Sequence, residues 1–205
     1  MDLSKKSKLT PTFYHHPTEQ IATDLLGKIL VRKVTSKLLA GRIVETEAYL
    51  SQNDEASHSF SGKSNRNKTM FNSSGFLYVY QIYGIHFCCN VVTGEKNEGS
   101  AVLIRAIEPI ENIEMMGLNR FGDTPTTHRN LTKLTNGPAK LCQSLSINLS
   151  DDGTDLQGDE IYILDSPKIS KNNIVKTTRI GITKSTELPL RFYIKDNSFV
   201  SKKWY

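Results

Sequence analysis

The sequence has only three cysteines, and two of them are neighbours in the chain. There is no CxxC pair, so the sequence encodes neither a zinc knuckle nor a disulfide framework. We expect Cys88, Cys89 and Cys142 to be reduced thiols in the core, as is usual for proteins of a reducing compartment.

Long apolar runs are also absent. No segment approaches the ~20 residues that are needed to span a bilayer. The first ten residues carry Lys5, Lys6 and Lys8 but lack the apolar stretch of a secretory signal. We therefore expect an intracellular protein that does not bind membranes. Internal repeats and low-complexity tracts are missing too, and 205 residues suffice for one domain with its own core.

Acidic residues are fewer than basic ones: the sequence has 21 aspartates and glutamates and 26 lysines and arginines, which gives a net charge of +5. This excess suits a polyanionic partner such as nucleic acid, although many proteins of similar charge bind none. The composition is otherwise that of an ordinary soluble protein, with 38% hydrophobic and 23% charged residues.

Periodicity along the chain predicts a mobile basic arm over residues 1–12 and a single α+β domain over residues 13–205. We expect a curved, mostly antiparallel sheet with a protruding β-hairpin and peripheral helices. The expected strands cover residues 28–35, 41–50, 76–83, 85–93, 100–107, 160–164, 178–183 and 190–195. Helices are expected to begin at Pro17-Thr18, at Pro109 and at Asn136-Gly137-Pro138, the last running to about Leu145. Residues 118–135 are expected to be irregular, and residues 51–75 to form a long polar loop that is functional or disordered.

Two glutamates lie close together in the strand expected over residues 41–50. Because strand side chains alternate, Glu45, Glu47 and Tyr49 share one face. Such a pair is usually a solvated face. In a cleft, however, two carboxylates perturb each other and one of them can act as a base. His58, in the polar loop that follows, is more often an exposed side chain without a role.

Tyrosines are concentrated in the next expected strand, where Tyr78, Tyr80 and Tyr83 fall within six residues. A core strand with amphipathic tyrosines is the ordinary interpretation. Tyr83, however, precedes Gly84 at the expected turn, so its ring would project from a hairpin tip. A projecting ring on a basic protein can wedge between base pairs and fill the space that a base has left.

Several collinear blocks of the sequence resemble the alkyladenine (3-methyladenine) DNA glycosylase family, and they span residues 24 to about 195. The blocks are GRIVETEAYL (41–50), DEASHS (54–59), RNKTMF (66–71), LYVYQIYGIHFCCN (77–90), VLIRAIEP (102–109), NGPAKLCQSLSIN (136–148), TRIGI (178–182) and LRFYI (190–194). The resemblance implies a monofunctional glycosylase that flips alkylated or otherwise damaged purines out of duplex DNA. It would hydrolyse the N-glycosidic bond with water, without a metal or cofactor, and so start base excision repair.

The resemblance also implies roles for individual residues. Glu47 is then the catalytic base, and Arg105 helps it to hold the attacking water near a phosphate. Tyr83 is the intercalating wedge. The base pocket would be formed by Tyr49, His58 and Tyr80 as ring walls, by Ala56 and Ile180 through backbone contacts, and by Asn90, which excludes the amino group of guanine. Arg66, Lys140 and Arg179 are phosphate-binding candidates, as is Arg120, with the N-terminal lysines adding nonspecific attraction.

Some features depart from the family pattern or leave alternatives open. His86 and Val92 stand where some relatives carry tyrosine and a small polar residue, which affects the range of lesions. The segment from Asn136 to Lys140 is either a plain capped helix or a phosphate site. For a neutral lesion, only a pocket water or His58 suggests itself as the general acid.

Two other functions fit parts of the sequence: a damage-binding module without activity, and a transferase or RNA-binding domain with a similar sheet. Retention of Glu47 with Arg105 argues against the first, and the projecting tyrosine argues against the second. The helix–hairpin–helix glycosylases are excluded by the strand-rich pattern and by the lack of their lysine motif. We expect a monomer acting on double-stranded DNA.

Overall fold

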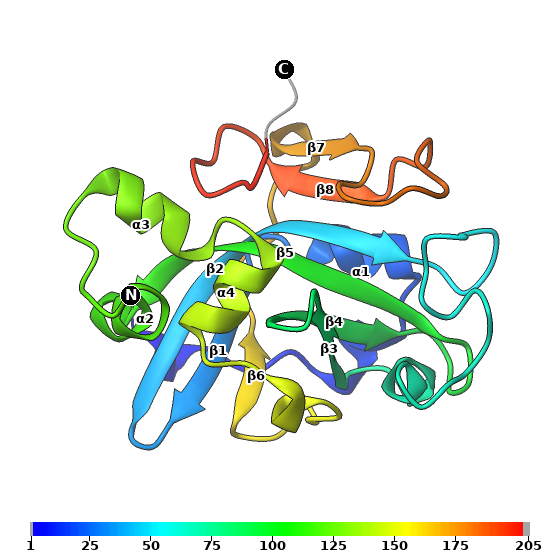
Figure 1. The fold of residues 1–205 in the computed structure, drawn as a ribbon, viewed down its shortest axis with the longest axis horizontal. Helices are drawn as coiled ribbons and strands as arrows, with labels where there is room; N and C mark the ends of the chain where they lie inside the picture. Colours follow the sequence, from blue (N-terminus) through cyan, green and yellow to red (C-terminus); the bar gives the residue numbers. More distant parts are fainter. Residues whose placement is uncertain (1, 203–205) are drawn as a thin grey trace.

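An eight-stranded antiparallel sheet organises the computed structural model, which describes residues 2–202 (Figure 1). Its main path runs in the order β3-β4-β5-β2-β1-β6, while β8 pairs with both β2 and β7. The strands are β1 (Ile29–Val34), β2 (Lys37–Tyr49), β3 (Leu77–Ile82), β4 (His86–Thr93), β5 (Ser100–Glu111), β6 (Ile161–Leu164), β7 (Ile174–Thr177) and β8 (Arg191–Ile194). Every strand pair is antiparallel, and the sheet does not close into a barrel. The predicted α+β class is confirmed.

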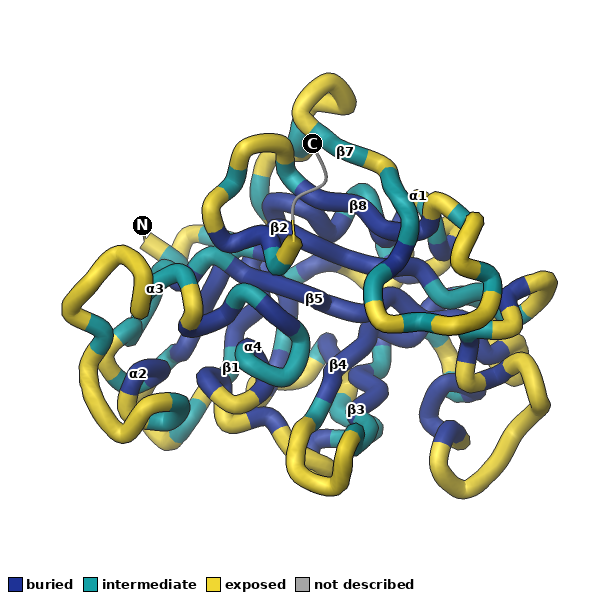
Figure 2. The backbone as a smooth tube through the Cα atoms, turned by 45° about the horizontal axis from the view of Figure 1, so that its top comes forward, coloured by how far each residue is buried: buried dark blue, intermediate teal, exposed yellow. Residues whose placement is uncertain are grey.

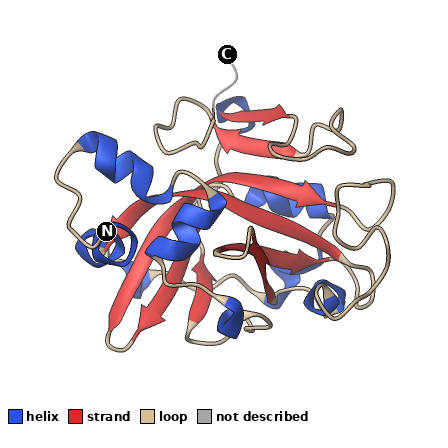
Figure 3. Cartoon of the chain, in the orientation of Figure 1, coloured by secondary structure: helices blue, strands red, loops and turns tan. Residues whose placement is uncertain are grey.

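The helices are short and lie around the sheet (Figure 3). The α-helices are α1 (Thr18–Asp24), α2 (Ile113–Phe121), α3 (His128–Thr135) and α4 (Pro138–Ser144). The 3-10 helices are η1 (Leu3–Lys5), η2 (Pro11–His15), η3 (Lys68–Phe71), η4 (Leu149–Asp151) and η5 (Lys171–Asn173). Within residues 2–202, no helix has the length and apolar character to cross a membrane.

The core is centred on β2 and β5, which are buried along most of their lengths (Figure 2). Such nearly continuous burial is expected of strands that are covered on both faces. Helix α1 packs against β2, and α4 packs against β4 and β5. All three cysteines are free and buried, as predicted.

The prediction that a helix begins at Pro109 is wrong, because β5 continues through Pro109 to Glu111 and α2 starts only at Ile113. Proline is tolerated inside a strand at a bulge, where a ladder hydrogen bond is already missing. Pro109 pairs with Gly41, next to a register shift in the β2–β5 pair, so the sheet accommodates it there.

The prediction of an irregular segment over residues 118–135 is also wrong in part, since α2 reaches Phe121 and α3 covers the last eight residues. Polar residues dominate α3, but the Thr127 side chain caps its first turn by accepting a hydrogen bond from the Asn130 N–H. Leu134 and Thr135 are buried at its other end. The capped first turn and the buried last turn therefore stabilise this helix, although its sequence has only a weak helical pattern.

The strand predicted over residues 178–183 does not form; β7 ends at Thr177 and a loop follows. In this loop the Ile180 N–H donates to the Glu47 carboxylate, and the Arg179 side chain donates to the Ala48 carbonyl. These bonds to β2 replace a strand ladder.

Residues 1–12 were predicted as a mobile arm, and the described part of this segment, residues 2–12, makes defined contacts with β6 and its surroundings. The Leu9 N–H donates to the Ile163 carbonyl, and Lys8 pairs with Asp159 at 2.6 Å. Lys6 Nζ donates to the Asp165 carbonyl. The segment is thus held along one edge of the sheet, and its mobility stays a prediction.

Candidate active site

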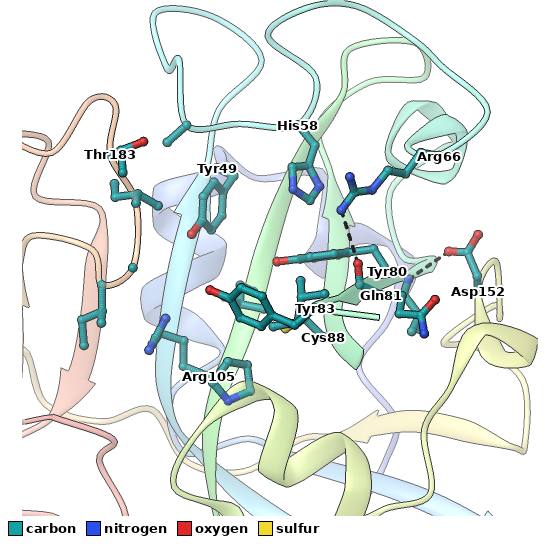
Figure 4. Close-up of a pocket in the computed structure, with 18 of the residues that line it drawn as sticks. Tyr49, His58, Arg66, Tyr80, Gln81, Tyr83, Cys88, Arg105, Asp152 and Thr183 are labelled. Carbon is teal, nitrogen blue, oxygen red and sulfur yellow. Dashed lines mark hydrogen bonds between the residues drawn. The ribbon is translucent and has the colours of Figure 1, made fainter. Parts of the chain in front are cut away.

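A cleft of about 1160 Å³ opens where the end of β2, the β3–β4 hairpin and the loop after β7 meet (Figure 4). Tyr49, His58 and Tyr80 line it, together with Arg105 from β5 and Ile180 from the loop. A small cavity of about 20 Å³ adjoins the cleft behind Tyr80 and His58, and Asn90 and Met70 help to line it.

Both glutamates of β2 are fully buried, with 0% of each residue exposed. Arg105 lies between them: its Nε donates to Glu45 at 3.2 Å and its Nη1 donates to Glu47 at 3.1 Å. Burial by itself would lower the pKa of Arg105, but the carboxylates of Glu47 and Glu45 raise it above its ordinary value. The guanidinium is therefore cationic. The interpretation of the pair as a solvated face is wrong.

Glu47 is held by three groups, each on a residue that lines the cleft. Besides Arg105, the Tyr49 hydroxyl donates to Oε2 at 3.0 Å, and the Ile180 N–H donates to Oε1 at 2.8 Å. Burial and the neighbouring Glu47 charge raise the pKa of Tyr49, so this hydroxyl keeps its proton. Glu47 thus lies directly beneath the surface of the cleft.

The aromatic walls of the cleft come from β2, β3 and the loop that follows β2 (Figure 4). The rings of His58 and Tyr80 meet edge to face with centroids 4.5 Å apart, and Tyr80 stacks on Tyr78 at 5.5 Å. His58 Nδ1 and the Tyr78 hydroxyl are 3.0 Å apart. Tyr49 stands across the cleft from His58, so the two rings bound a space that is open to solvent.

The β3–β4 hairpin turns at Tyr83-Gly84, as the sequence predicts, because Ile82 pairs with His86 as the last rung. Tyr83 and Gly84 have φ of 50° and 72°, in the left-handed region that glycine adopts easily and tyrosine does not. The Tyr83 ring is 90% exposed and Ile85 is 73% exposed, so an apolar tip projects into solvent beside the cleft.

Comparison with known proteins matches residues 12–198 of this chain to the family model of methylpurine-DNA glycosylases. The chain belongs to this family. Relatives named provisionally as 3-methyladenine DNA glycosylases include a Francisella tularensis protein, 50% identical over 189 residues, which are 91% of this chain and 94% of the relative. Others come from Methanoculleus marisnigri (44% over 200 residues; 95% and 99% coverage) and Carboxydothermus hydrogenoformans (47% over 192 residues; 93% and 97%). The protein is a DNA glycosylase of the repair class, and DNA is its substrate.

The structure brings together most residues that the resemblance assigns to the site of this DNA glycosylase. The set that lines the large cleft comprises Tyr49, Ala56, His58, Arg66, Tyr80, Tyr83, Arg105 and Ile180. Asn90 lies deeper, 3% exposed, and its side-chain amide donates to the Tyr78 carbonyl at 3.1 Å. Of the two positions that depart from the pattern, His86 is exposed near the hairpin tip and Val92 is buried in the core.

Arg179, one of the predicted phosphate contacts, is buried. Its side chain is 0% exposed and makes a bidentate pair with Asp54 at 2.6 and 2.7 Å. The guanidinium carbon lies 4.6 Å from the centre of the Tyr49 ring. Burial alone would lower the pKa of Arg179, but Asp54 raises it above its ordinary value. Arg179 is thus buried beside Tyr49 with both terminal nitrogens paired, an arrangement that does not favour a phosphate contact, and the contact stays a prediction.

The other phosphate-binding candidates are on the surface or near it. Arg66 is exposed at the cleft and donates to the Gln81 carbonyl at 3.3 Å. Lys140 is half-buried, with Nζ 2.7 Å from the Asn136 side chain. Burial, then Arg120 and Lys133, lower the pKa of Lys140. Lys140 on α4 therefore has Arg120 of α2 and Lys133 of α3 as cationic neighbours, and it follows Pro138, which lines the cleft, by two residues.

Three residues near the site have contacts that sequence reasoning did not predict. Asp54 holds Arg179 and the backbone N–H of Leu50 and of Ala56. Tyr78 shares its strand face with Tyr80, so the alternation of strand side chains could have predicted that Tyr78 lies beside the pocket. For Arg191, buried against Glu45 at 2.7 Å, the sequence offered no signal. In the part of the chain that the structure describes, no three His, Cys, Asp or Glu residues are grouped as a metal site.

Proposed function

We propose that the protein is a monofunctional glycosylase that flips an alkylated or otherwise damaged purine out of duplex DNA and hydrolyses its N-glycosidic bond. One observation carries this proposal: a buried carboxylate, Glu47, is bound to a cationic arginine directly beneath an aromatic cleft. A base entering the cleft would place its sugar close to this carboxylate.

The flipped base would stack between Tyr49 and His58, with Tyr80 closing the pocket. A cationic purine is attracted to aromatic faces by about 1–2 kcal/mol once water is removed. The backbone of Ala56 would contact the base edge. Asn90, deeper in the pocket, would exclude an unmodified guanine by opposing its amino group. A damaged base also unstacks more easily, which adds to selection.

In the proposed reaction of an alkylated, cationic purine, the bond between C1′ and the purine nitrogen breaks, and the bonding electrons leave with the base, which becomes neutral. A neutral lesion would in addition need a proton from a pocket water or His58. Positive charge then develops on the sugar, as in glycoside hydrolysis. Glu47 would stabilise that charge and accept a proton from water, whose oxygen forms the new bond to C1′. Arg105 would hold the water and the nearby phosphate. The products are the free base and an abasic sugar.

Tyr83 is proposed to insert into the duplex where the nucleotide has left. A left-handed tyrosine costs about 1–2 kcal/mol, and because Tyr83 is 90% exposed, packing against the described residues offsets little of this cost. Strain of this kind is typical of functional positions. Arg66 and Lys140 are proposed to bind phosphates, and the protein would act as a monomer because one chain supplies every group of the site.

The test replaces Glu47 by glutamine, which keeps the side chain's shape but cannot accept the proton. We expect Glu47→Gln to lower single-turnover base release by about a thousandfold or more while lesion binding is kept. Glu55→Gln is the matched control, since Glu55 lines the same cleft but is exposed and pairs with Lys184. Base release is measured on duplexes that each carry one modified purine.

A loss of less than tenfold for Glu47→Gln would remove this residue from the role of base. If the wild-type protein bound damaged duplexes but released no base from any of them, the chain would instead be a damage-binding module.

A further inference from the structure

The geometry points to Glu45, Arg191 and Ser201 as positioning residues that hold Arg105 against Glu47. This inference rests on the proposed function of Glu47 and Arg105, and it adds the second glutamate, β8 and the end of the chain to the site. None of the three lines the cleft, so each would act through Arg105.

Glu45 receives four hydrogen bonds from three directions. Its Oε1 accepts from Arg105 Nε at 3.2 Å, from Arg191 Nε at 2.7 Å and from the Ser201 hydroxyl at 2.9 Å. Its Oε2 accepts from the Ser201 N–H at 2.7 Å. A buried carboxylate with this many donors is fixed in one orientation, and it fixes the guanidinium that it contacts.

Charge balance explains why Arg191 is part of the network. Two buried carboxylates, Glu45 and Glu47, would otherwise share the single positive charge of Arg105. Arg191 is itself 0% exposed and supplies the second positive charge from β8, where its register partner on β2 is Glu47 and its side chain reaches Glu45. Because each buried carboxylate then has an arginine, Arg105 can remain paired with Glu47 without leaving Glu45 unneutralised.

An irregularity in the sheet directs Arg105 toward both glutamates. In the β2–β5 pair, Glu45 lies opposite Ala106 while Thr46 lies opposite Ile104, so Arg105 has no partner on β2. On the other side of this step, Val44 is the extra residue of β2. Bulges of this kind re-aim side chains next to active sites.

The C-terminal segment Phe199–Ser201 packs against this irregularity. Phe199 is buried in a cluster with Val44 and Ala106, the residues that flank the register shifts. Val200 is buried as well, and the Arg191 side chain donates to the Lys202 carbonyl. Ser201 is thereby placed where both its N–H and its hydroxyl reach Glu45.

The decisive experiment is a double-mutant cycle on Glu45 and Arg105. We expect Glu45→Gln to slow single-turnover base release by about tenfold to a hundredfold, since displacement of a catalytic group by about 1 Å has that effect. Lesion binding, measured separately, should change less than about threefold, because the aromatic pocket is intact. The double variant Glu45→Gln/Arg105→Lys should be no slower than Arg105→Lys alone, because Glu45 acts through Arg105.

Ser201→Ala is the milder variant that answers the question if Glu45→Gln does not fold. It removes one hydroxyl and keeps the N–H bond, and we expect base release to slow by about twofold to fivefold. Its matched control is Ser144→Ala, which removes a buried serine hydroxyl that donates to the Leu134 carbonyl and not to Glu45. Both variants should lower the melting temperature, but only Ser201→Ala should slow base release.

Additive losses in the double-mutant cycle, or equal losses of lesion binding and base release, would mean that Glu45 has only a structural role, and the inference would be overturned. These results can be told apart from a failure of the proposed function. If the proposed function were wrong, Glu47→Gln would keep base release, whatever the Glu45 variants do.

Discussion

At the scale of single residues, the two glutamates of β2 show how similar side chains acquire different tasks. Both are buried, and both bind Arg105. Glu45 accepts hydrogen bonds from Arg191, which is buried, and from Ser201, which is half-buried, and neither of them lines the cleft. The partners of Glu47 are all residues that line the cleft. It is these neighbours that make Glu47 the candidate base and Glu45 a candidate support.

A pH dependence follows from His58. Its ring stands exposed at the mouth of the cleft, yet its inner edge packs on Tyr78 and Tyr80. This partial burial, and then the charge of Arg66, lower the pKa of His58 below its ordinary value of 6.5. His58 is therefore neutral at pH 7 and becomes cationic only in acid, where it would repel a cationic lesion. We expect binding of 7-methylguanine duplexes to weaken as the pH falls from 7 to 5, and binding of a neutral lesion to change less.

His58→Gln should remove this difference between lesions, and His16→Gln, at an exposed histidine outside the cleft, should leave it unchanged. The lowered pKa of His58 also makes the free energy of unfolding depend on pH. Below pH 6.5 the unfolded chain binds a proton on this residue more readily than the folded one, so the wild type loses stability relative to His58→Gln as the pH falls. Equal pH profiles of lesion binding for wild type and His58→Gln would contradict the assignment.

At the scale of elements, the β3–β4 hairpin holds two groups of tyrosines with different proposed tasks: the strand tyrosines form the pocket, and the tyrosine at the tip is the wedge. Tyr78 and Tyr80 are two residues apart and face the pocket side, where they stack on each other. The turn at Tyr83-Gly84 breaks this alternation and turns the Tyr83 ring into solvent. A change at the tip should therefore leave the pocket intact.

Tyr83→Ser tests this separation. Extruding a stacked nucleotide costs a few kcal/mol, and a ring that fills the vacated space offsets part of that cost. We expect the variant to slow base release from paired lesions by about tenfold or more, and from single-stranded DNA by much less. The measurement is the ratio of single-turnover rates, variant to wild type, on the two substrates. Equal ratios would place Tyr83 in the pocket or the core and end its assignment as a wedge.

At the scale of the whole molecule, part of the positive charge behind the net +5 lies in the interior. Arg105, Arg179 and Arg191 are buried, and each is paired with a carboxylate. The cations that remain for DNA near the cleft are exposed ones such as Arg66 and Lys184. Beyond the phosphate proposed for Arg105, the cations at the rim are therefore the ones that we expect to bind phosphates.

Salt should consequently weaken DNA binding steeply, with each phosphate contact adding about −0.9 to the slope of log K against log salt. We expect Arg66→Gln to make the slope shallower by about 1. Lys37→Gln is the matched control, because Lys37 is exposed at the β1–β2 turn and does not line the cleft. A slope near zero for the wild type, or equal slopes for the two variants, would contradict phosphate binding at the rim.

Much of this protein was determined by local sequence. Alternation along residues 41–50 and 76–93 was enough to predict the central strands and the hairpin, because one residue's neighbours set its face in a strand. The helix after Asn136 followed from a proline at its first turn. The blocks that resemble the glycosylase family were enough to predict the pocket residues, because each of these residues lies within a recognisable local motif.

Tertiary structure alone decided which charges face one another. Arg179 was predicted to bind phosphate and residues 178–183 to form a strand, whereas the Arg179 side chain pairs with Asp54 and the Ile180 N–H binds Glu47. No local pattern indicated that Arg191 would bind Glu45. The assignment of Glu47 and Glu45 to different tasks also depended on residues up to 156 positions away in the chain. Electrostatic pairing acts between atoms that are close in space, and a bulge of one residue redirects it, so no local pattern contains this information.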